Sequence, residues 1–250
     1  MLKALLRRTP LWAVARRVRD RIFPVRGLGL NAVYDAQTIE VMRKVLRPGA
    51  VAVDAGAHTG QITREMVALT PGGRVLAFEP IPALAREIRE TVPGAEVFEY
   101  ALSDEAGPAT FQHVVNDPAY SGLRQRDYDR PDPIIEEIPV TVARLDDLLP
   151  ADVAVDFIKL DVEGAEFAIV RGALEVIRRG RPVIVFEASA RSTGRYGVTP
   201  DEMFRTFTET LGYRVSTMDR WLRGRDPYTL AEFAGNWNFG PEYYFIAYPG

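Results

Sequence analysis

The sequence predicts an α/β fold, with a mostly parallel β-sheet and helices on both of its faces. Short apolar runs alternate with segments of helical periodicity, several runs end in a carboxylate, and one run opens directly into a glycine-containing turn. Strands that alternate with helices imply right-handed crossovers, which make neighbouring strands parallel. The chain of 250 residues is long enough for one large core. We therefore expect one domain over residues 31–250, preceded by a helical N-terminal extension over residues 1–30.

This N-terminal extension is strongly basic. Residues 1–26 carry eight lysines and arginines against Asp20 alone, so their net charge is +7 and that of the remaining chain is −10. After Thr9 and Pro10, which begin a helix well, apolar residues recur at helical spacing. We expect residues 9–23 to rest on an anionic membrane surface, or to make a packing or dimer contact. Nucleic-acid enzymes more often carry basic stripes across their body, so we expect no nucleic-acid partner.

Composition restricts the compartment and the metal chemistry. The longest apolar run in the extension, residues 11–15, is too short for a transmembrane span or the core of a secretory signal. The expectation is a cytoplasmic protein, or one held peripherally at a membrane. Cysteine is absent, which excludes disulfides and cysteine-ligated metals and fits a reducing compartment. Carboxylate ligation of a divalent cation such as Mg²⁺ stays open, but the sequence does not indicate one and we assign no metal ligand.

The elements predicted for the domain begin with a helix over residues 35–46, which Asp35 caps. A buried strand at residues 51–53 follows, and a glycine turn leads from it into a helix at residues 61–69. The same rhythm predicts further strands at residues 74–78, 95–102, 156–160, 182–186, 213–218 and 243–248, and further helices at residues 83–91, 166–177 and 200–211.

A different pattern interrupts this rhythm at about residues 107–143. Strands predicted at residues 109–115 and 138–143 form a hairpin, and a polar loop rich in Pro, Asp, Tyr and Arg joins them at residues 116–137. A loop of this length within a compact domain is typical of a functional flap or a disordered segment. We expect it to form one wall of a substrate site.

Four predicted strands end in a carboxylate, at Asp54, Glu79, Asp161 and Glu187, and Asp104 lies just past a fifth. One acidic residue at a strand end is most often a helix cap or a solvated loop group. The carboxyl ends of parallel strands, however, meet in one crevice, where loops converge on a ligand. Four carboxylates there would suit a ligand that carries positive charge or many hydroxyls.

The spacing around the glycine turn narrows the class of ligand. Asp54-x-Gly56-x-x-x-Gly60 departs from the G-x-G-x-x-G fingerprint, which argues against a pyrophosphate and disfavours an NAD(P)-dependent oxidoreductase. Glu79 lies 23 residues beyond Gly56, where an acidic side chain takes the hydroxyls of a ribose. A cofactor with a ribose and a cationic, phosphate-free arm fits this pattern, and S-adenosylmethionine is such a molecule.

Several stretches of the chain resemble one known family. They occur in the order VAVDAGAHTGQ, VLAFEPIP, YALSDEAG, ARLDDLL, FIKLDVEGAE and RPVIVFE. Together they resemble the FkbM family of S-adenosylmethionine-dependent methyltransferases, over roughly Asp35 to Glu187. The glycine turn alone is shared by many methyltransferases, whereas its combination with LDVEGAE after the fourth core strand is much more specific.

This resemblance implies a Rossmann-like class I methyltransferase fold with a seven-stranded sheet. It implies that Asp54, Gly56 and Gly60 surround the methionine part of the cofactor and that Glu79 binds the ribose hydroxyls. His58 stands in this turn where the family often shows asparagine, and either side chain can bond the loop backbone. The residues implied to border the adenine are Ala101, Leu102, Ser103 and Asp104.

The resemblance also implies that Asp161 ends the strand that faces the methyl group, with Glu163 and Glu166 behind it. Family members with known substrates mostly methylate hydroxyl oxygens of sugars and natural products. Such a reaction needs an acceptor held in line, water excluded, and a base or a metal-bound alkoxide. Asp161 is the first candidate for the base, ahead of Glu163, Glu187 and His113. The alternatives are an N-cap for Asp161, a helix-dipole role for Glu163 and Glu166, and a structural role for His113.

The sequence thus favours S-adenosylmethionine-dependent O-methylation of a small-molecule or saccharide acceptor. The alternatives are a non-catalytic protein that keeps the fold and binds a membrane or a partner, and the disfavoured oxidoreductase. The residues predicted as candidates for an acceptor pocket are Tyr120, Ser121, Tyr128, Trp221 and Trp237.

Overall fold

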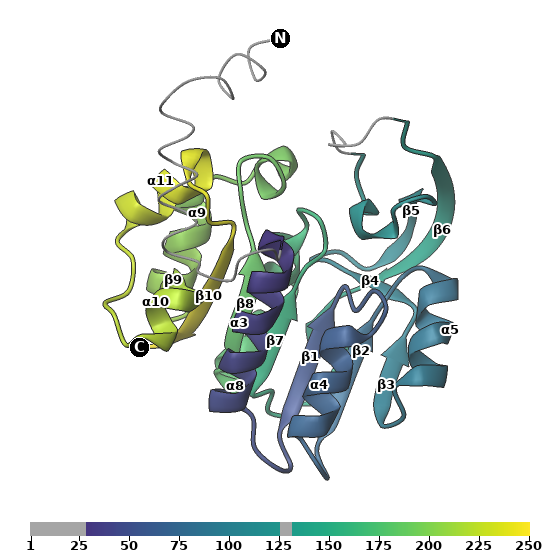
Figure 1. Ribbon diagram of the computed structural model, residues 1–250, viewed down its shortest axis with the longest axis horizontal. Helices are drawn as coiled ribbons and strands as arrows, with labels where there is room; N and C mark the ends of the chain where they lie inside the picture. Colours follow the sequence, from purple (N-terminus) through teal and green to yellow (C-terminus); the bar gives the residue numbers. More distant parts are fainter. Residues whose placement is uncertain (1–28, 126–131) are drawn as a thin grey trace.

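The structure is a computed structural model that describes residues 29–125 and 132–250 (Figure 1). Its centre is a seven-stranded sheet in the order β3-β2-β1-β7-β8-β10-β9. Within it β10 runs antiparallel to both of its neighbours, and the other pairs are parallel, which confirms the predicted sheet. The strands are β1 Val51–Ala55, β2 Arg74–Phe78, β3 Ala95–Phe98, β7 Phe157–Leu160, β8 Val183–Glu187, β9 Tyr213–Thr217 and β10 Tyr244–Pro249.

Helices cover both faces of this sheet, as predicted (Figure 1). One face carries α3 Leu30–Val45, α4 Gln61–Leu69, α5 Pro82–Thr91 and α10 Met218–Leu222. The other carries α6 Leu145–Leu148, α7 Glu166–Arg171, α8 Leu174–Gly180, α9 Pro200–Arg205 and α11 Leu230–Phe239. The two largest apolar clusters lie on opposite sides of the sheet.

Side chains alternate along each strand, and this alternation determines which of them point to each face of the sheet. Ala52 of β1 and Phe157 of β7 pack in the cluster under α3 and α4, whereas Val53 packs in the opposite cluster. Because residues two apart in a strand share a face, Asp54 and Lys159 continue the side of Ala52 and Phe157. The register pairs Asp54 directly with Lys159. Two charged side chains therefore meet at the carboxyl ends of β1 and β7.

A second, three-stranded sheet has the order β4-β6-β5 and contains the predicted hairpin. It consists of β4 Tyr100–Leu102, β5 Gly107–Val114 and β6 Ile135–Ala143. The single strand expected at residues 95–102 is wrong, because the chain leaves the main sheet after Phe98 and β4 pairs with β6 instead. The polar loop is also shorter than expected, since β6 begins at Ile135 and a 3-10 turn, η1, spans Pro118–Tyr120.

One predicted helix start and one predicted strand end need correction, and one helix was not predicted. Helix α3 begins at Leu30, so Asp35 lies inside the helix and is not its cap, because the buried Tyr34 extends the apolar face toward the N-terminus. Strand β9 ends at Thr217, whose hydroxyl caps α10. Helix α11 was not predicted, although Thr229 and Glu232 form a capping box that is visible in the sequence.

The long helix predicted up to Ile177 is divided into α7 and α8 at Gly172. A Cβ at Gly172 would lie 2.1 Å from the carbonyl oxygen of Ser103, so only glycine allows this close approach. Asp146 then caps the second helix, because its carboxylate accepts hydrogen bonds from the backbone N–H groups of Glu175 and Val176. The predicted helix at residues 200–211 likewise changes after Arg205 into a π-helical segment, η3, over Thr206–Thr210.

The basic segment at residues 9–23 lies outside the described residues. Its membrane or dimer contact therefore stays a prediction, as does the boundary between residues 1–30 and 31–250. Among the described helices, none is both long and apolar enough to cross a membrane.

We predict that Gly172→Ala destabilises the protein by about 1–3 kcal/mol, because the new methyl group must push the Ser103 backbone away. Gly235→Ala is the matched control. Gly235 is an exposed glycine inside α11 with open space around it, so alanine there should stabilise the protein by up to about 1 kcal/mol. Urea denaturation of both variants measures the two free energies of unfolding, and equal effects would contradict the close-approach argument.

Candidate active site

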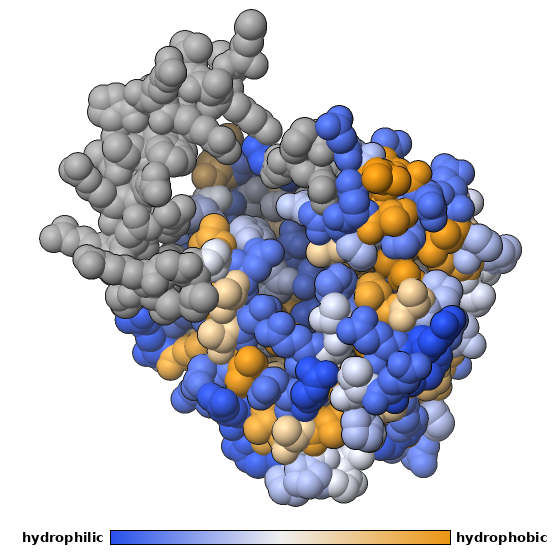
Figure 2. Space-filling model, turned by 45° about the vertical axis from the view of Figure 1, so that its right-hand side comes forward, coloured by the Kyte–Doolittle hydropathy of each residue, from blue (hydrophilic) through white to orange (hydrophobic). Residues whose placement is uncertain are grey.

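A cavity of about 920 Å³ lies at the carboxyl ends of β1, β2, β7 and β8. Its walls come from the glycine turn, the N-terminal part of α3, the segment around η1, and the end of α11. Figure 2 shows this side of the molecule hollowed, with hydrophilic residues bordering the recess. The volume falls in the range of small-molecule sites. The predicted crevice at the strand ends is therefore a real cavity.

The glycine turn forms the floor of the cavity with its backbone. Gly56 has a φ of 77°, and a Cβ there would lie 1.9 Å from the carbonyl oxygen of Asp161, so β1 and β7 can approach only through glycine. Gly60, with a φ of 74°, precedes the first residue of α4. His58 also has a left-handed backbone, with a φ of 51°. Histidine is among the residues enriched in that conformation, so His58 suits this turn.

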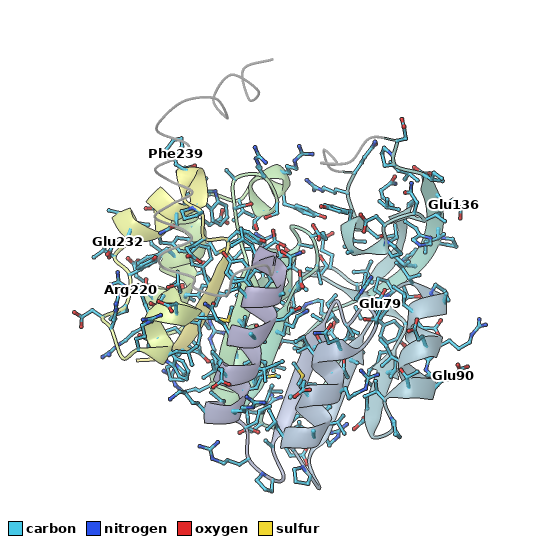
Figure 3. All side chains as sticks on the ribbon, viewed as in Figure 1. Glu79, Glu90, Glu136, Arg220, Glu232 and Phe239 are labelled. Atoms are coloured by element: carbon cyan, nitrogen blue, oxygen red, sulfur yellow. The ribbon has the colours of Figure 1, made fainter. Side chains whose placement is uncertain are left out.

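Glu79 connects this turn to the next one. Its carboxylate is buried directly after β2 and accepts hydrogen bonds of 2.9 Å from the backbone N–H groups of His58 and Ile81. Burial raises the pKa of Glu79 to about 7, although the two N–H groups act in the opposite direction. Figure 3 shows Glu79 at the cavity end of the sheet, whereas Glu90 points outward from α5. Glu79 thus holds two cavity-lining loops in place.

Lys159 bridges the ends of β1 and β7. Its Nζ lies 3.4 Å from Oδ1 of Asp54, 3.3 Å from Oδ2 of Asp161 and 3.3 Å from the carbonyl oxygen of Gly56. Oδ2 of Asp54 accepts a hydrogen bond of 2.7 Å from the hydroxyl of Thr63 on α4. Burial lowers the pKa of Lys159, but Asp161 and Asp54 outweigh it and the pKa is raised. The lysine therefore stays charged in the folded protein.

Sequence reasoning missed Lys159, although the signal was present as one lysine inside the apolar run FIKL. A charged residue at the buried position of a strand requires a partner, because an unpaired buried charge is very costly. The identity of the partners depends on the register between β1 and β7, which the sequence does not contain.

Three carboxylates gather on the cavity wall beside this bridge. Oxygen atoms of Asp161, Glu163 and Glu187 lie within 4.8 Å of one another. Asp35 of α3 lies close by, and its pKa is raised by burial and by Asp161 while Lys159 acts against the shift. Neighbouring carboxylates favour a positively charged ligand or a shared proton. Such oxygens also suit a hard cation, so the expectation of no metal stays a prediction.

Glu166 shapes the loop that carries Asp161 and Glu163. It is fully buried, and its Oε1 accepts hydrogen bonds of 3.0 and 3.1 Å from the backbone N–H groups of Val162 and Gly164. Burial raises the pKa of Glu166 to about 7, although these N–H groups lower it. Glu166 is therefore a loop-holding residue behind the cavity wall, on the same principle as Glu79.

Some residues of the predicted site lie elsewhere. Ala101 and Leu102 line the main cavity, but Ser103 and Asp104 line a smaller pocket of about 350 Å³. Asp104 pairs there with Arg171, at 2.7 Å. His113 lies on β5 opposite Glu136 and does not line the main cavity. Asp54 is fully buried beneath the glycine turn, and neither it nor Gly60 lines the cavity. The predicted site residues that do line it are Gly56, His58, Glu79, Ala101, Leu102, Asp161, Glu163 and Glu187.

The acceptor-pocket candidates divide in the same way. Tyr120, Ser121 and Trp237 line the cavity, whereas Trp221 packs against Tyr248 with ring centroids 6.2 Å apart. Tyr128 lies outside the described residues. The structure adds cavity-lining residues that the sequence did not indicate, namely Asn31, Tyr34, Asp35, Lys159, Tyr243 and Tyr244.

The fold and the cavity together define a protein of the class I methyltransferase type. The antiparallel β10 lies between β8 and β9, and the glycine turn follows the central β1. A family model described as the methyltransferase FkbM domain matches residues 54–215, which is more than half of the chain. The chain belongs to this family. Methyl transfer is thereby favoured over the hydride transfer that the sequence left as an alternative.

Three relatives of the chain have low sequence identity to it. The AMB antimetabolite synthetase AmbE of Pseudomonas aeruginosa is 34% identical over 112 residues, which are 40% of this chain and 5% of that protein. Methyltransferase 1 of Beauveria bassiana is 31% identical over 141 residues, 48% of this chain and 57% of the relative. The 2-O-methyltransferase NoeI of Sinorhizobium fredii is 25% identical over 191 residues, 68% of this chain and 75% of the relative. The match thus spans a small part of the first relative and just over half of the second.

We predict that the stabilising effect of Glu166 depends on pH. Its folded pKa of about 7 lies above its ordinary value of 4.5, so its contribution to stability is complete below the ordinary value and is lost as the pH rises through about 7. The free energy of unfolding of the wild type minus that of Glu166→Gln should therefore fall between about pH 5 and about pH 8. The exposed Glu90→Gln is the control, and its difference from the wild type should stay constant. A constant difference for Glu166→Gln as well would refute the argument.

Proposed function

We propose that the protein transfers a methyl group from S-adenosylmethionine to a hydroxyl oxygen of a saccharide or a natural-product small molecule. The observation that carries the proposal is the convergence of the glycine turn, Glu79 and Asp161 on one cavity. A further support is the similarity of the chain to NoeI, which is named a 2-O-methyltransferase. The large polar cavity has room for a cofactor and an acceptor side by side.

The residues present fit this cofactor. Each oxygen of Glu79 accepts one backbone hydrogen bond, which leaves lone pairs for the two ribose hydroxyls. Beside it, Phe78, Ile81, Ala101 and Leu102 offer apolar surface to an adenine ring. The backbone of the glycine turn lies open to the cavity, where a Cβ at Gly56 would disrupt its contact with β7. When bound, S-adenosylmethionine supplies a methyl group on a positively charged sulfonium.

Asp161 is the residue we propose to orient the acceptor and take its proton. Its carboxylate is 31% exposed and lines the cavity, while Lys159 holds one of its oxygens from behind. A hydroxyl that donates to Asp161 would be fixed in position and would lose its proton to the carboxylate as the oxygen becomes methylated. Glu163 and Glu187 stand beside it and can accept hydrogen bonds from other hydroxyls of the acceptor.

We expect Glu79→Ala to weaken S-adenosylmethionine binding roughly 100-fold or more, because the variant loses two hydrogen bonds to a charged group, each of which contributes about 1.5–3 kcal/mol. Isothermal titration calorimetry with S-adenosylmethionine and S-adenosylhomocysteine measures this loss. Both ligands carry the same ribose, so the affinity for both should fall by the same factor. Glu90→Ala, on the outer surface of α5, is the control and should bind as the wild type does. A wild-type protein that binds neither ligand would overturn the proposed function.

We expect Asp161→Asn to lower turnover by about 100-fold or more, because general-base catalysis contributes in that range. The affinity for S-adenosylmethionine should change by less than about tenfold, because only one nearby charge is removed. Methyl transfer to a panel of neutral sugars and hydroxylated natural products gives the turnover, and calorimetry gives the affinity. If binding and turnover were lost in equal measure, Asp161 would be a cofactor-binding residue and the proposed base would be wrong.

A further inference from the structure

Lys159 is a buried lysine whose contacts are more elaborate than the stability of the fold requires. It is 5% exposed and follows the apolar Phe157 and Ile158 in β7. Removing an ammonium and two carboxylates from water is costly, and apolar residues of similar size often replace buried ion pairs without loss of stability. A leucine or methionine would continue the strand. The charge at this position therefore points to a functional role.

The contacts of Lys159 lie in a continuous row beneath the cavity. Thr63 of α4 donates to Asp54 at the end of β1, and Asp54 contacts Lys159. Lys159 contacts Asp161, and Asp161 acts electrostatically on the phenol of Tyr244 on β10. Burial and Asp161 raise the pKa of this tyrosine well above its usual range, so Tyr244 is neutral. Negative, positive and negative side chains alternate along the row, and its net charge is one negative unit.

The surroundings of this row are acidic. Asp35 of α3 lies close enough to Lys159 and Asp161 for both to act on its pKa, and Asp161 adds to burial in raising the pKa of Glu166 and of Tyr243. Glu163 and Glu187 complete the set on the cavity side. The Nζ atom of Lys159 lies 3.4 Å from Asp54 and 3.3 Å from Asp161, so this lysine is their shared counter-charge. Without it, the buried Asp54 and the cavity-lining Asp161 would lie close together without a neutralising charge.

We propose that Lys159 is a positioning residue that acts through its charge. Lys159 joins the glycine turn to Asp161. Its charge also offsets part of the negative charge that a bound sulfonium would meet, and so controls the preference of the site for S-adenosylmethionine over S-adenosylhomocysteine. The inference rests on the proposed function, because it concerns the same cofactor site. The net negative charge of the row adds to that of Glu163 and Glu187, and together they attract the cationic substrate more than the demethylated product. The positive charge of Lys159 limits this attraction. S-adenosylmethionine is then bound without being held so tightly that methyl transfer to the acceptor is slowed.

The test compares the dissociation constants of the two ligands, which differ in charge at the sulfur atom. In Lys159→Met the row carries two net negative charges, so the ratio of the constant for S-adenosylmethionine to that for S-adenosylhomocysteine should fall roughly fivefold, as expected when one nearby charge is removed from a partly hydrated site. Lys159→Arg keeps the charge and should keep the ratio. The double variant Lys159→Met with Asp161→Asn restores one net negative charge and should return the ratio toward that of the wild type.

Calorimetry measures both constants for each variant, and thermal melting checks that the variant is folded. Lys44→Met, the same substitution at an exposed lysine of α3, is the matched control and should leave the ratio unchanged. If Lys159→Met does not fold, Lys159→Gln removes the charge while keeping a hydrogen-bond donor.

A folded, charge-removing variant that weakens both ligands equally would show a merely structural role and overturn the inference. A double variant that leaves the ratio of Lys159→Met unchanged would overturn it too. These outcomes differ from failure of the proposed function, in which the wild-type protein binds neither ligand.

Discussion

The close approach of β1 and β7 at their carboxyl ends is the constraint on which the site depends. It exists because Gly56 has no Cβ, since any larger residue would meet the carbonyl oxygen of Asp161 at 1.9 Å. The parallel register then places Asp54 beside Lys159, and the lysine reaches Asp161 two residues further along the chain. The absence of a Cβ at Gly56 and the row of Asp54, Lys159 and Asp161 thus connect the glycine turn of the proposed cofactor site to the carboxylate proposed for catalysis.

Two buried carboxylates have a structural role, which differs from the catalytic role proposed for Asp161. Glu79 and Glu166 each use their carboxylate to hold two backbone N–H groups of neighbouring loops, and burial raises the pKa of each to about 7. Glu166 is sealed behind the loop, whereas Glu79 lines the cavity as well. Asp161, Glu163 and Glu187 are more exposed and lie on the cavity wall. The fold therefore separates acids that hold loops from acids that can meet an acceptor.

Local sequence patterns predicted most strands of the main sheet, but they did not predict which strands pair with one another. The runs that became β1, β2, β7 and β8 are short, apolar and bounded by turns, so their strand character depends on local burial alone. The strand expected at residues 95–102 divides between two sheets because β4 finds its partner in β6, where Tyr100 pairs with Thr141. The position of His113 and the separation of Asp104 from the cavity follow from the same second sheet. No local pattern contains such long-range pairing.

The sequence by itself determined the α/β class, the glycine turn and the carboxylates at the strand ends, because periodicity, glycine spacing and strand-end position are local properties of the chain. The left-handed backbone of His58, which suits histidine, came only from the structure. The tertiary structure alone decided that Lys159 is the counter-charge of Asp54 and Asp161, that Asp35 lies near them, and that Ser103 faces another pocket. These facts depend on strand register and on the path of segments far apart in the chain, and both are settled only when the core packs.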